Sequence, residues 1–185
     1  MPSFRFIPLE LPGVVLIQSS VYRDERGSFT EVFRADVFRA AGLPDVFVQD
    51  NHSVSGYGVI RGLHYQLPPF AQGKLVYVTA GTAWDVLVDV RRESPQFGRW
   101  LSLELRAGDG RAVYIPPGFA HGFAALADQT HVVYKCTALY APSQEAGIRW
   151  NDPTLAIHWP VERPTVSPKD AALPTLRDAR PFVVA

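Results

Sequence analysis

The sequence predicts an all-β fold with few and short helices. Apolar residues fall in short runs rich in Val, Ile, Tyr and Thr, and clusters of Gly, Pro, Asp or Ser separate these runs. The runs that we interpret as strands are residues 13–22, 46–55, 74–90, 99–105, 111–117 and 131–140. The sequence lacks the helical segments that an α/β sheet needs between its strands. We therefore expect a β-sandwich or a β-barrel.

The segments outside these strands are expected to add little regular structure. One helix is predicted over residues 35–42, with Gly42 as its C-terminal stop. The stretch TAGTA, residues 79–83, separates two apolar runs and predicts an antiparallel hairpin. From about residue 161 the chain is rich in proline and charge, so we expect an irregular tail with at most one short helix. The chain, residues 1–185, is expected to form a single domain.

The composition excludes several classes of protein. Eighteen basic residues balance eighteen acidic ones, which disfavours a nucleic-acid binder with a basic face but leaves room for a small anionic ligand. No apolar run approaches the length of a membrane span. Prolines interrupt the N-terminal stretch, so it does not read as a signal peptide. The single cysteine, Cys136, is expected to be buried and unreactive, and it suits a reducing cytoplasm.

The stretch GDGRAVYIPPGFAHGF, residues 108–123, resembles the second half of the cupin signature. The matching residues are Gly110, Pro116, Gly118 and His121. In that signature the chain turns at the mouth of a jelly-roll barrel and the histidine points inward. The first half normally supplies His-x-His and a glutamate, but here Gln66 stands in place of the second histidine, two residues after His64. Two histidines are fewer than the three protein ligands of a catalytic metal site. The motif therefore predicts a cupin-type jelly roll, or double-stranded β-helix, without a metal.

The stretch GVIRGLHYQ, residues 58–66, places Arg61 and His64 inside an apolar run. In a regular strand these two side chains would point to opposite faces, but a bulge at Gly62 would bring them to the same side. Buried charges are costly unless they are paired or bind a ligand. A barrel filled by a polar ligand explains the two residues, and a half-exposed sheet with surface charges is the alternative.

A histidine paired with a carboxylate makes a good general base, because the carboxylate fixes the tautomer and stabilises the imidazolium. Candidate carboxylates are Asp50, Asp85, Asp89 and Asp170, and spacing in the sequence does not choose among them. A lysine such as Lys74 can stabilise a developing oxyanion, and a tyrosine can donate a proton. These residues suggest proton abstraction next to a carbonyl. Acyl transfer is disfavoured, since no serine or cysteine lies in a nucleophile-elbow context.

Eight blocks of sequence together resemble the dTDP-4-dehydrorhamnose 3,5-epimerase family. They are RDERGSFTEVF, QDNHSVSGYGVIRGLHYQ, QGKLVYVTAG, DVLVDVRRESPQFGRW, IPPGFAHGF, YKCTALYAP, GIRWNDP and SPKDAALP, in this order. The resemblance covers about residues 14–178 and implies a cupin-type jelly roll that works without metal or other cofactor. It implies a homodimer with exchanged N-terminal strands, and epimerisation of a dTDP-linked 4-keto-6-deoxy sugar at carbons 3 and 5.

The resemblance also implies roles for individual residues. His64 matches the base, Asp170 its orienting acid, Lys74 the residue that holds the oxyanion at O4, and Tyr134 the acid on the opposite face. Residues expected to bind substrate are Gln49, Asn51, Arg61, His121, Tyr140 and Lys169, together with Arg23, Phe29 and Glu31 from a segment that reaches the nucleotide, expected to come from the neighbouring subunit.

Three alternatives to double epimerisation remain open from the sequence. A mono-epimerase acting only at carbon 3 or carbon 5 would use nearly the same residues. A metal-dependent cupin isomerase or oxygenase would bind a stoichiometric metal. A non-catalytic cupin that binds a sugar nucleotide would have no need for the set His64, Asp170 and Tyr134.

Overall fold

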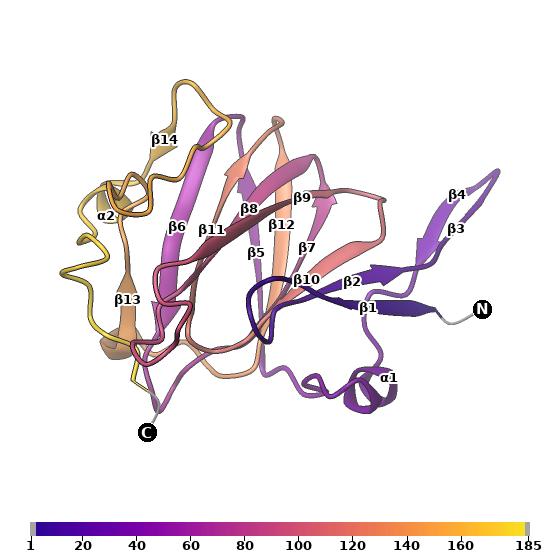
Figure 1. Ribbon diagram of the computed structural model, residues 1–185. Coiled ribbons are helices and arrows are strands. Elements are labelled where there is room, and N and C mark those ends of the chain that lie inside the picture. The colour runs from indigo at the N-terminus through magenta and orange to yellow at the C-terminus, as the bar shows by residue number, and fades with distance from the viewer. Residues whose placement is uncertain (1–2, 184–185) are drawn as a thin grey trace.

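The computed structural model describes residues 3–183, and most of its regular structure is strand. Two sheets face each other (Figure 1). The first, which we call the β7 sheet, has the order β1 (Phe4–Pro8), β2 (Val15–Ser19), β10 (Arg111–Ile115), β7 (Lys74–Ala80), β12 (Thr130–Cys136) and β5 (Gln49–Ser55). The second, the β6 sheet, has the order β13 (Glu145–Gly147), β6 (Val59–Gln66), β11 (Phe119–Ala125), β8 (Thr82–Asp89) and β9 (Trp100–Arg106), and β14 (Thr165–Val166) pairs with β6.

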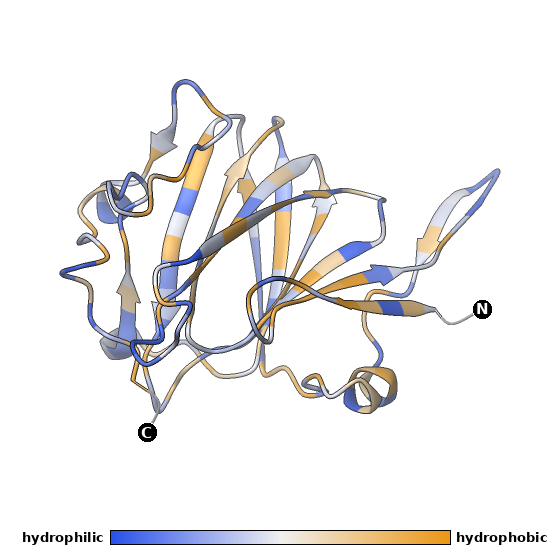
Figure 2. Ribbon diagram, in the orientation of Figure 1, coloured by the Kyte–Doolittle hydropathy of each residue, from blue (hydrophilic) through white to orange (hydrophobic). Residues whose placement is uncertain are grey.

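The chain crosses repeatedly between the two sheets, which is the connectivity of a jelly roll. From β5 to β8 each strand lies in the sheet opposite its predecessor, and the strands from β9 to β12 alternate in the same way. The main core fills the space between the sheets with Val76 and Val132 from one side and Leu87 and Phe123 from the other. Figure 2 shows apolar residues along the strands of both sheets. The predicted cupin-type jelly roll is confirmed.

The predicted hairpin at residues 79–83 is wrong. Strands β7 and β8 lie in different sheets: β7 pairs with β10 and β12, whereas β8 pairs with β9 and β11. The turn at Gly81, with φ +71°, carries the chain from one sheet to the other. Both strands are central and need two partners each, and these partners come from distant parts of the chain. Turn residues alone do not reveal that choice.

The N-terminal segments form strands that were not predicted, because prolines interrupt the sequence there. Strand β1 ends at Pro8 and lies at an edge of the β7 sheet, where a missing N–H is tolerated. Strands β3 (Val21–Asp24) and β4 (Gly27–Thr30) form a separate ribbon that projects away from both sheets (Figure 1). The predicted helix is present as α1 (Ala35–Ala40), and its Phe38 is fully buried against the outer face of the β7 sheet.

The tail packs along strand β6 (Figure 1). It contains the short helix α2 (Pro168–Ala171), as expected, and also strand β14. A single turn of 3₁₀-helix spans Pro142–Gln144. Within residues 3–183, no helix is long and apolar enough to cross a membrane.

The predicted bulge in strand β6 is present. His64 pairs with His121, and Arg61 pairs with Phe123. The paired positions are therefore three residues apart on β6 but only two residues apart on β11. Gly62 has φ +117°, and a Cβ atom there would lie 2.6 Å from the Cα of Gly122. The bulge turns Arg61 and His64 toward the same cavity.

We predict that Gly62→Ala destabilises the protein by about 2–4 kcal/mol, because it adds a steric clash to an unfavourable φ. Gly27→Ala is the matched control: Gly27 also has a large positive φ, +127°, but a Cβ atom there would meet nothing within 4 Å. Chemical denaturation should show a loss of only about 1–2 kcal/mol for the control. Equal losses for the two variants would contradict a tight contact at the bulge.

Candidate active site

A cavity of about 430 Å³ lies between the two sheets. The β6 sheet contributes Arg61, His64 and His121, and the β7 sheet contributes Lys74 and Tyr134. A neighbouring cavity of about 300 Å³ shares His64, Lys74 and Tyr134, and these three residues therefore stand at the junction of the two hollows.

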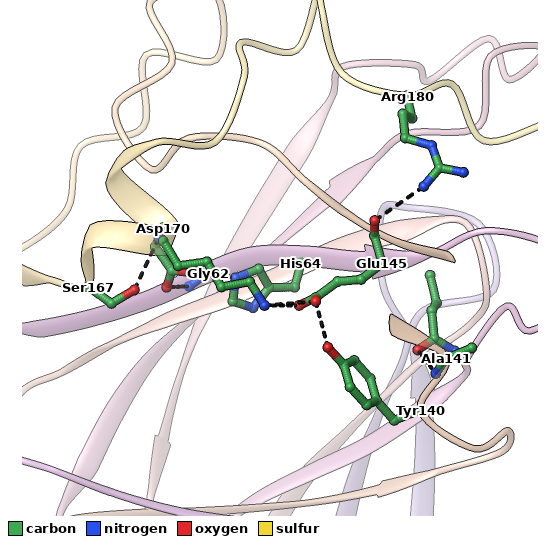
Figure 3. Close-up of polar contacts among 10 residues, drawn as sticks. Gly62, His64, Tyr140, Ala141, Glu145, Ser167, Asp170 and Arg180 are labelled. Carbon is green, nitrogen blue, oxygen red and sulfur yellow. Dashed lines mark hydrogen bonds and ion pairs between the residues drawn. The ribbon is translucent and has the colours of Figure 1, made fainter. Parts of the chain in front are cut away.

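His64 is held by a carboxylate from the tail. Its Nε2 lies 2.7 Å from Oδ1 of Asp170, and the other carboxylate oxygen accepts a hydrogen bond of 3.1 Å from the Gly62 amide (Figure 3). Asp170 lies in the first turn of α2, where its amide donates to the N-cap Ser167 Oγ at 3.0 Å. The structure thus brings together His64 and Asp170, the residues that the resemblance assigns as base and orienting acid.

The environment of Asp170 favours its ionised form. Burial by itself would raise the pKa of this carboxyl, but hydrogen bonds from His64 and the Gly62 amide outweigh burial and lower the pKa below its usual value. Asp170 is therefore a carboxylate at neutral pH. It fixes the hydrogen on Nε2 of His64 and leaves Nδ1 as the free ring nitrogen.

The three other candidate carboxylates have different partners. Asp85 lies 2.9 Å from Nε2 of His121, and both side chains are buried. Asp89 binds Arg91, and Asp50 binds Lys135 on the outer face. Contacts in three dimensions therefore select Asp170 for His64, which spacing in the sequence did not do.

Lys74 and Tyr134 form the opposite wall of the cavity. Burial lowers the pKa of Lys74, although nearby acidic groups partly offset this effect. Its ammonium group lies 5.9 Å from the centre of the Tyr134 ring. Burial raises the pKa of Tyr134, so its hydroxyl group stays protonated at neutral pH. A lysine amine with a lowered pKa and a tyrosine hydroxyl that can donate a proton thus face the histidines across the cavity.

Five of the predicted binding residues line the two hollows: Gln49, Asn51, Arg61, His121 and Tyr140. Arg61 donates hydrogen bonds to Ser55 Oγ and the Val54 carbonyl. Gln49 binds Asn51 at 3.1 Å and accepts a hydrogen bond from the amide of Tyr140 at 2.7 Å. Both Gln49 and Asn51 belong to β5 and line the smaller cavity.

Glu145 is a member of this site that sequence reasoning missed. Its carboxylate accepts hydrogen bonds from the Tyr140 hydroxyl and from Lys169 Nζ, each 2.7 Å from Oε2. Burial would raise the pKa of Glu145, but these hydrogen bonds lower it overall. Figure 3 shows Glu145 between the tail and Tyr140. No motif in the sequence around Glu145 indicates a role in the site. Ser167 was also missed, although a serine before a proline is a recognisable signal for a helix N-cap.

Four predicted residues are absent from the lining of both cavities. Lys169 is one of them, and it binds Glu145, which lines the smaller cavity. Arg23 and Phe29 lie on the projecting ribbon, where Arg23 binds the Gly108 carbonyl and Phe29 is 69% exposed. Glu31 follows the ribbon and lies 3.8 Å from Arg34. The expected approach of Arg23, Phe29 and Glu31 to a nucleotide in the neighbouring subunit stays a prediction.

A family model described as dTDP-4-dehydrorhamnose 3,5-epimerase matches residues 8–178. The chain belongs to this family. A relative of that name from Shigella flexneri is 48% identical over 178 residues, which cover 96% of this chain and 98% of the relative. A second relative of that name, from Methanothermobacter thermautotrophicus, is 49% identical over 162 residues, which cover 88% of this chain and 87% of the relative.

Solved structures of the epimerase family share the fold. The dTDP-4-dehydrorhamnose 3,5-epimerase from Sulfolobus tokodaii superposes with a TM-score of 0.91 at 41% identity, over 98% of this chain and 99% of that one. An epimerase from Legionella pneumophila in complex with dTDP-4-keto-L-rhamnose gives a TM-score of 0.90 at 45% identity, over 95% of this chain and 94% of that one. Within residues 3–183, no group of three or more His, Cys, Asp or Glu side chains is arranged to hold a metal ion.

We predict that Asp170 stabilises this epimerase-family fold in a pH-dependent way. Because its folded-state pKa is lowered, its contribution is present above the unfolded pKa of about 3.9 and is lost as the pH falls through the folded value. The stability advantage of the native protein over Asp170→Asn should therefore be constant at pH 5 and above, and should shrink as the pH falls below about 4 in urea titrations. Glu25→Gln, at an exposed position, is the control and should show a constant difference. An Asp170→Asn difference that grows on acidification would contradict the assignment.

Proposed function

We propose that the protein converts dTDP-4-dehydro-6-deoxy-glucose into dTDP-4-dehydrorhamnose by inverting carbons 3 and 5. The observation that carries this proposal is the arrangement of a carboxylate-bound histidine and a protonated tyrosine on facing walls of one cavity. Membership of the 3,5-epimerase family supports it. So does the 45% identity to a relative solved with dTDP-4-keto-L-rhamnose.

The first half of each inversion is proton removal by His64. Carbons 3 and 5 flank the ketone at carbon 4, so their hydrogens are acidified. The free Nδ1 of His64 takes the proton, and the electrons of the C–H bond form an enolate with its negative charge on O4. Asp170 offsets the charge that develops on the imidazole. Lys74, across the cavity, stabilises the enolate oxygen.

The second half is proton return by Tyr134 from the other face of the sugar ring. A base and an acid on the same wall would return the proton to the face from which it came, with no net change. His64 stands on β6 and Tyr134 on β12, in opposite sheets, so removal and return occur on opposite faces. The carbon is inverted as a result.

The remaining residues are proposed to bind the nucleotide sugar. Arg61 is suited to the diphosphate because its guanidinium presents paired donors. Gln49, Asn51, His121, Tyr140 and Lys169 complete the cleft. We further propose a homodimer with exchanged N-terminal strands, in which Arg23, Phe29 and Glu31 approach the nucleotide of the partner subunit, and a cytoplasmic location, in keeping with a single buried cysteine.

Replacement of the base tests the function directly. The native protein, incubated with dTDP-4-dehydro-6-deoxy-glucose in deuterated water, should incorporate deuterium at carbons 3 and 5. His64→Asn should lower the rate of doubly inverted product by about 10²–10⁴-fold, because it lacks the base. His158→Asn, an exposed histidine outside the cavity, is the control and should match the native rate.

Each alternative predicts a different labelling pattern in this assay. Deuterium at only one carbon with the native protein would indicate a mono-epimerase, and deuterium at neither would indicate a binding protein. An unchanged rate for His64→Asn would refute the assignment of the base.

Replacement of the acid should separate exchange from inversion. In Tyr134→Phe the base remains, so deuterium exchange should persist while inversion falls by about 10²-fold or more. NMR of the product measures both quantities. Tyr77→Phe, in the neighbouring strand but outside the cavity, should leave both unchanged. Equal loss of exchange and inversion in Tyr134→Phe would contradict a role limited to proton return.

A further inference from the structure

A second histidine–carboxylate pair lies beside the first. His121 on β11 is the direct cross-strand partner of His64 on β6, and both side chains line the same cavity. Each histidine uses Nε2 to contact a carboxylate oxygen, at 2.7 Å for His64 and 2.9 Å for His121. The carboxylates come from opposite sides, Asp170 from the tail beyond β6 and Asp85 from β8 beyond β11.

His121 also lies against the proposed acid. Its ring centre is 6.4 Å from that of Tyr134, in an edge-to-face arrangement. Directly opposite residues of an antiparallel pair have Cβ atoms about 4.5–5.5 Å apart, so the His64 and His121 side chains are close neighbours. His121 therefore links His64 on one wall to Tyr134 on the other.

The burial of Asp85 is poorly supported by hydrogen bonds, although its charge partly offsets the effect of burial, which lowers the pKa of Lys74. Asp85 is fully buried. Within residues 3–183 its side chain hydrogen-bonds only His121, through Oδ1, and its Oδ2 has no partner. Asp89, equally buried in the same strand, accepts four hydrogen bonds from Arg91 and Ser94. A poorly satisfied carboxylate in a core is less favourable than an apolar side chain of similar size. Asp85 thus calls for a chemical role.

The proposed reaction creates a need that this pair can meet. Each inversion moves one proton onto His64 and takes one from Tyr134, which leaves an imidazolium on one wall and a phenolate on the other. The second inversion in the same substrate requires both groups to be restored. Passage of a proton from His64 to Tyr134 would restore both groups without release of the sugar.

We propose that His121, positioned by Asp85, relays this proton from His64 to Tyr134 between the two inversions. The inference rests on the proposed function. The proton that leaves His64 passes to a water that exchanges with solvent, so solvent deuterium still reaches both carbons. The free Nδ1 of His121 accepts a proton from this water and becomes an imidazolium whose charge Asp85 offsets. His121 then gives a proton to the Tyr134 phenolate oxygen. His64 ends as the neutral base, Tyr134 as the phenol and His121 as the neutral imidazole, with no net gain or loss of protons.

The test is the time course of singly and doubly inverted sugar in a single turnover, followed by NMR with enzyme in excess. In Asp85→Asn the first inversion should proceed within about threefold of the native rate. The second should slow by at least about tenfold, so a singly inverted sugar accumulates. Asp89→Asn is the matched control, a buried carboxylate of the same strand outside the cavity. It should lower stability without accumulation of the singly inverted sugar.

The possible outcomes separate this inference from the proposed function. Equal slowing of both inversions in Asp85→Asn, or no accumulation at all, overturns the relay while double inversion by the native protein upholds the function. A native protein that inverts neither carbon overturns the function and the relay together. If Asp85→Asn does not fold, His121→Ala takes its place, and added imidazole should speed its second inversion selectively. Failure of imidazole to do so also contradicts the relay.

Discussion

The hydrogen bond between His64 and Asp170 joins strand β6 to the tail across 106 residues of sequence. It depends on two local devices. The bulge at Gly62 turns His64 toward the cavity and directs the Gly62 amide at Asp170. The Ser167 cap starts the short helix that carries Asp170. Because the carboxylate is supplied by the tail, the tail is part of the proposed active site. The proposed base is oriented only after this last segment of the chain has packed.

The jelly roll solves the stereochemical problem that inversion poses. Two sheets packed face to face naturally present side chains to both faces of a flat ligand between them. Histidines from the β6 sheet and Lys74 with Tyr134 from the β7 sheet occupy these two walls. Glu145 ties Tyr140 to Lys169 at one side, next to the residue that positions the base. The apolar core thus holds the two sheets in place, and the polar side chains that line the cavity carry out the proposed chemistry.

Much of this could be predicted from residues alone, and the failures have physical causes. Short β-branched runs predicted the strands, and the bulge followed from a glycine between two polar residues. The hairpin at Gly81 failed because central strands choose partners by shared burial, which turn residues do not encode. Spacing did not choose among four carboxylates for the base, since three of them satisfy other cations or histidines in the folded chain. Glu145 stayed hidden because it lies in no recognisable motif, and because its cationic partner, Lys169, comes from the tail.

The most direct test of the central claim is a crystal structure with the dTDP-linked keto sugar bound to Tyr134→Phe. We expect Nδ1 of His64 about 3–3.5 Å from carbon 3 or carbon 5 on one face of the ring, with the residue-134 ring against the other face. Asp170 should still contact Nε2. A sugar bound with both side chains on the same face, or with His64 turned away from the ring carbons, would contradict the proposed mechanism.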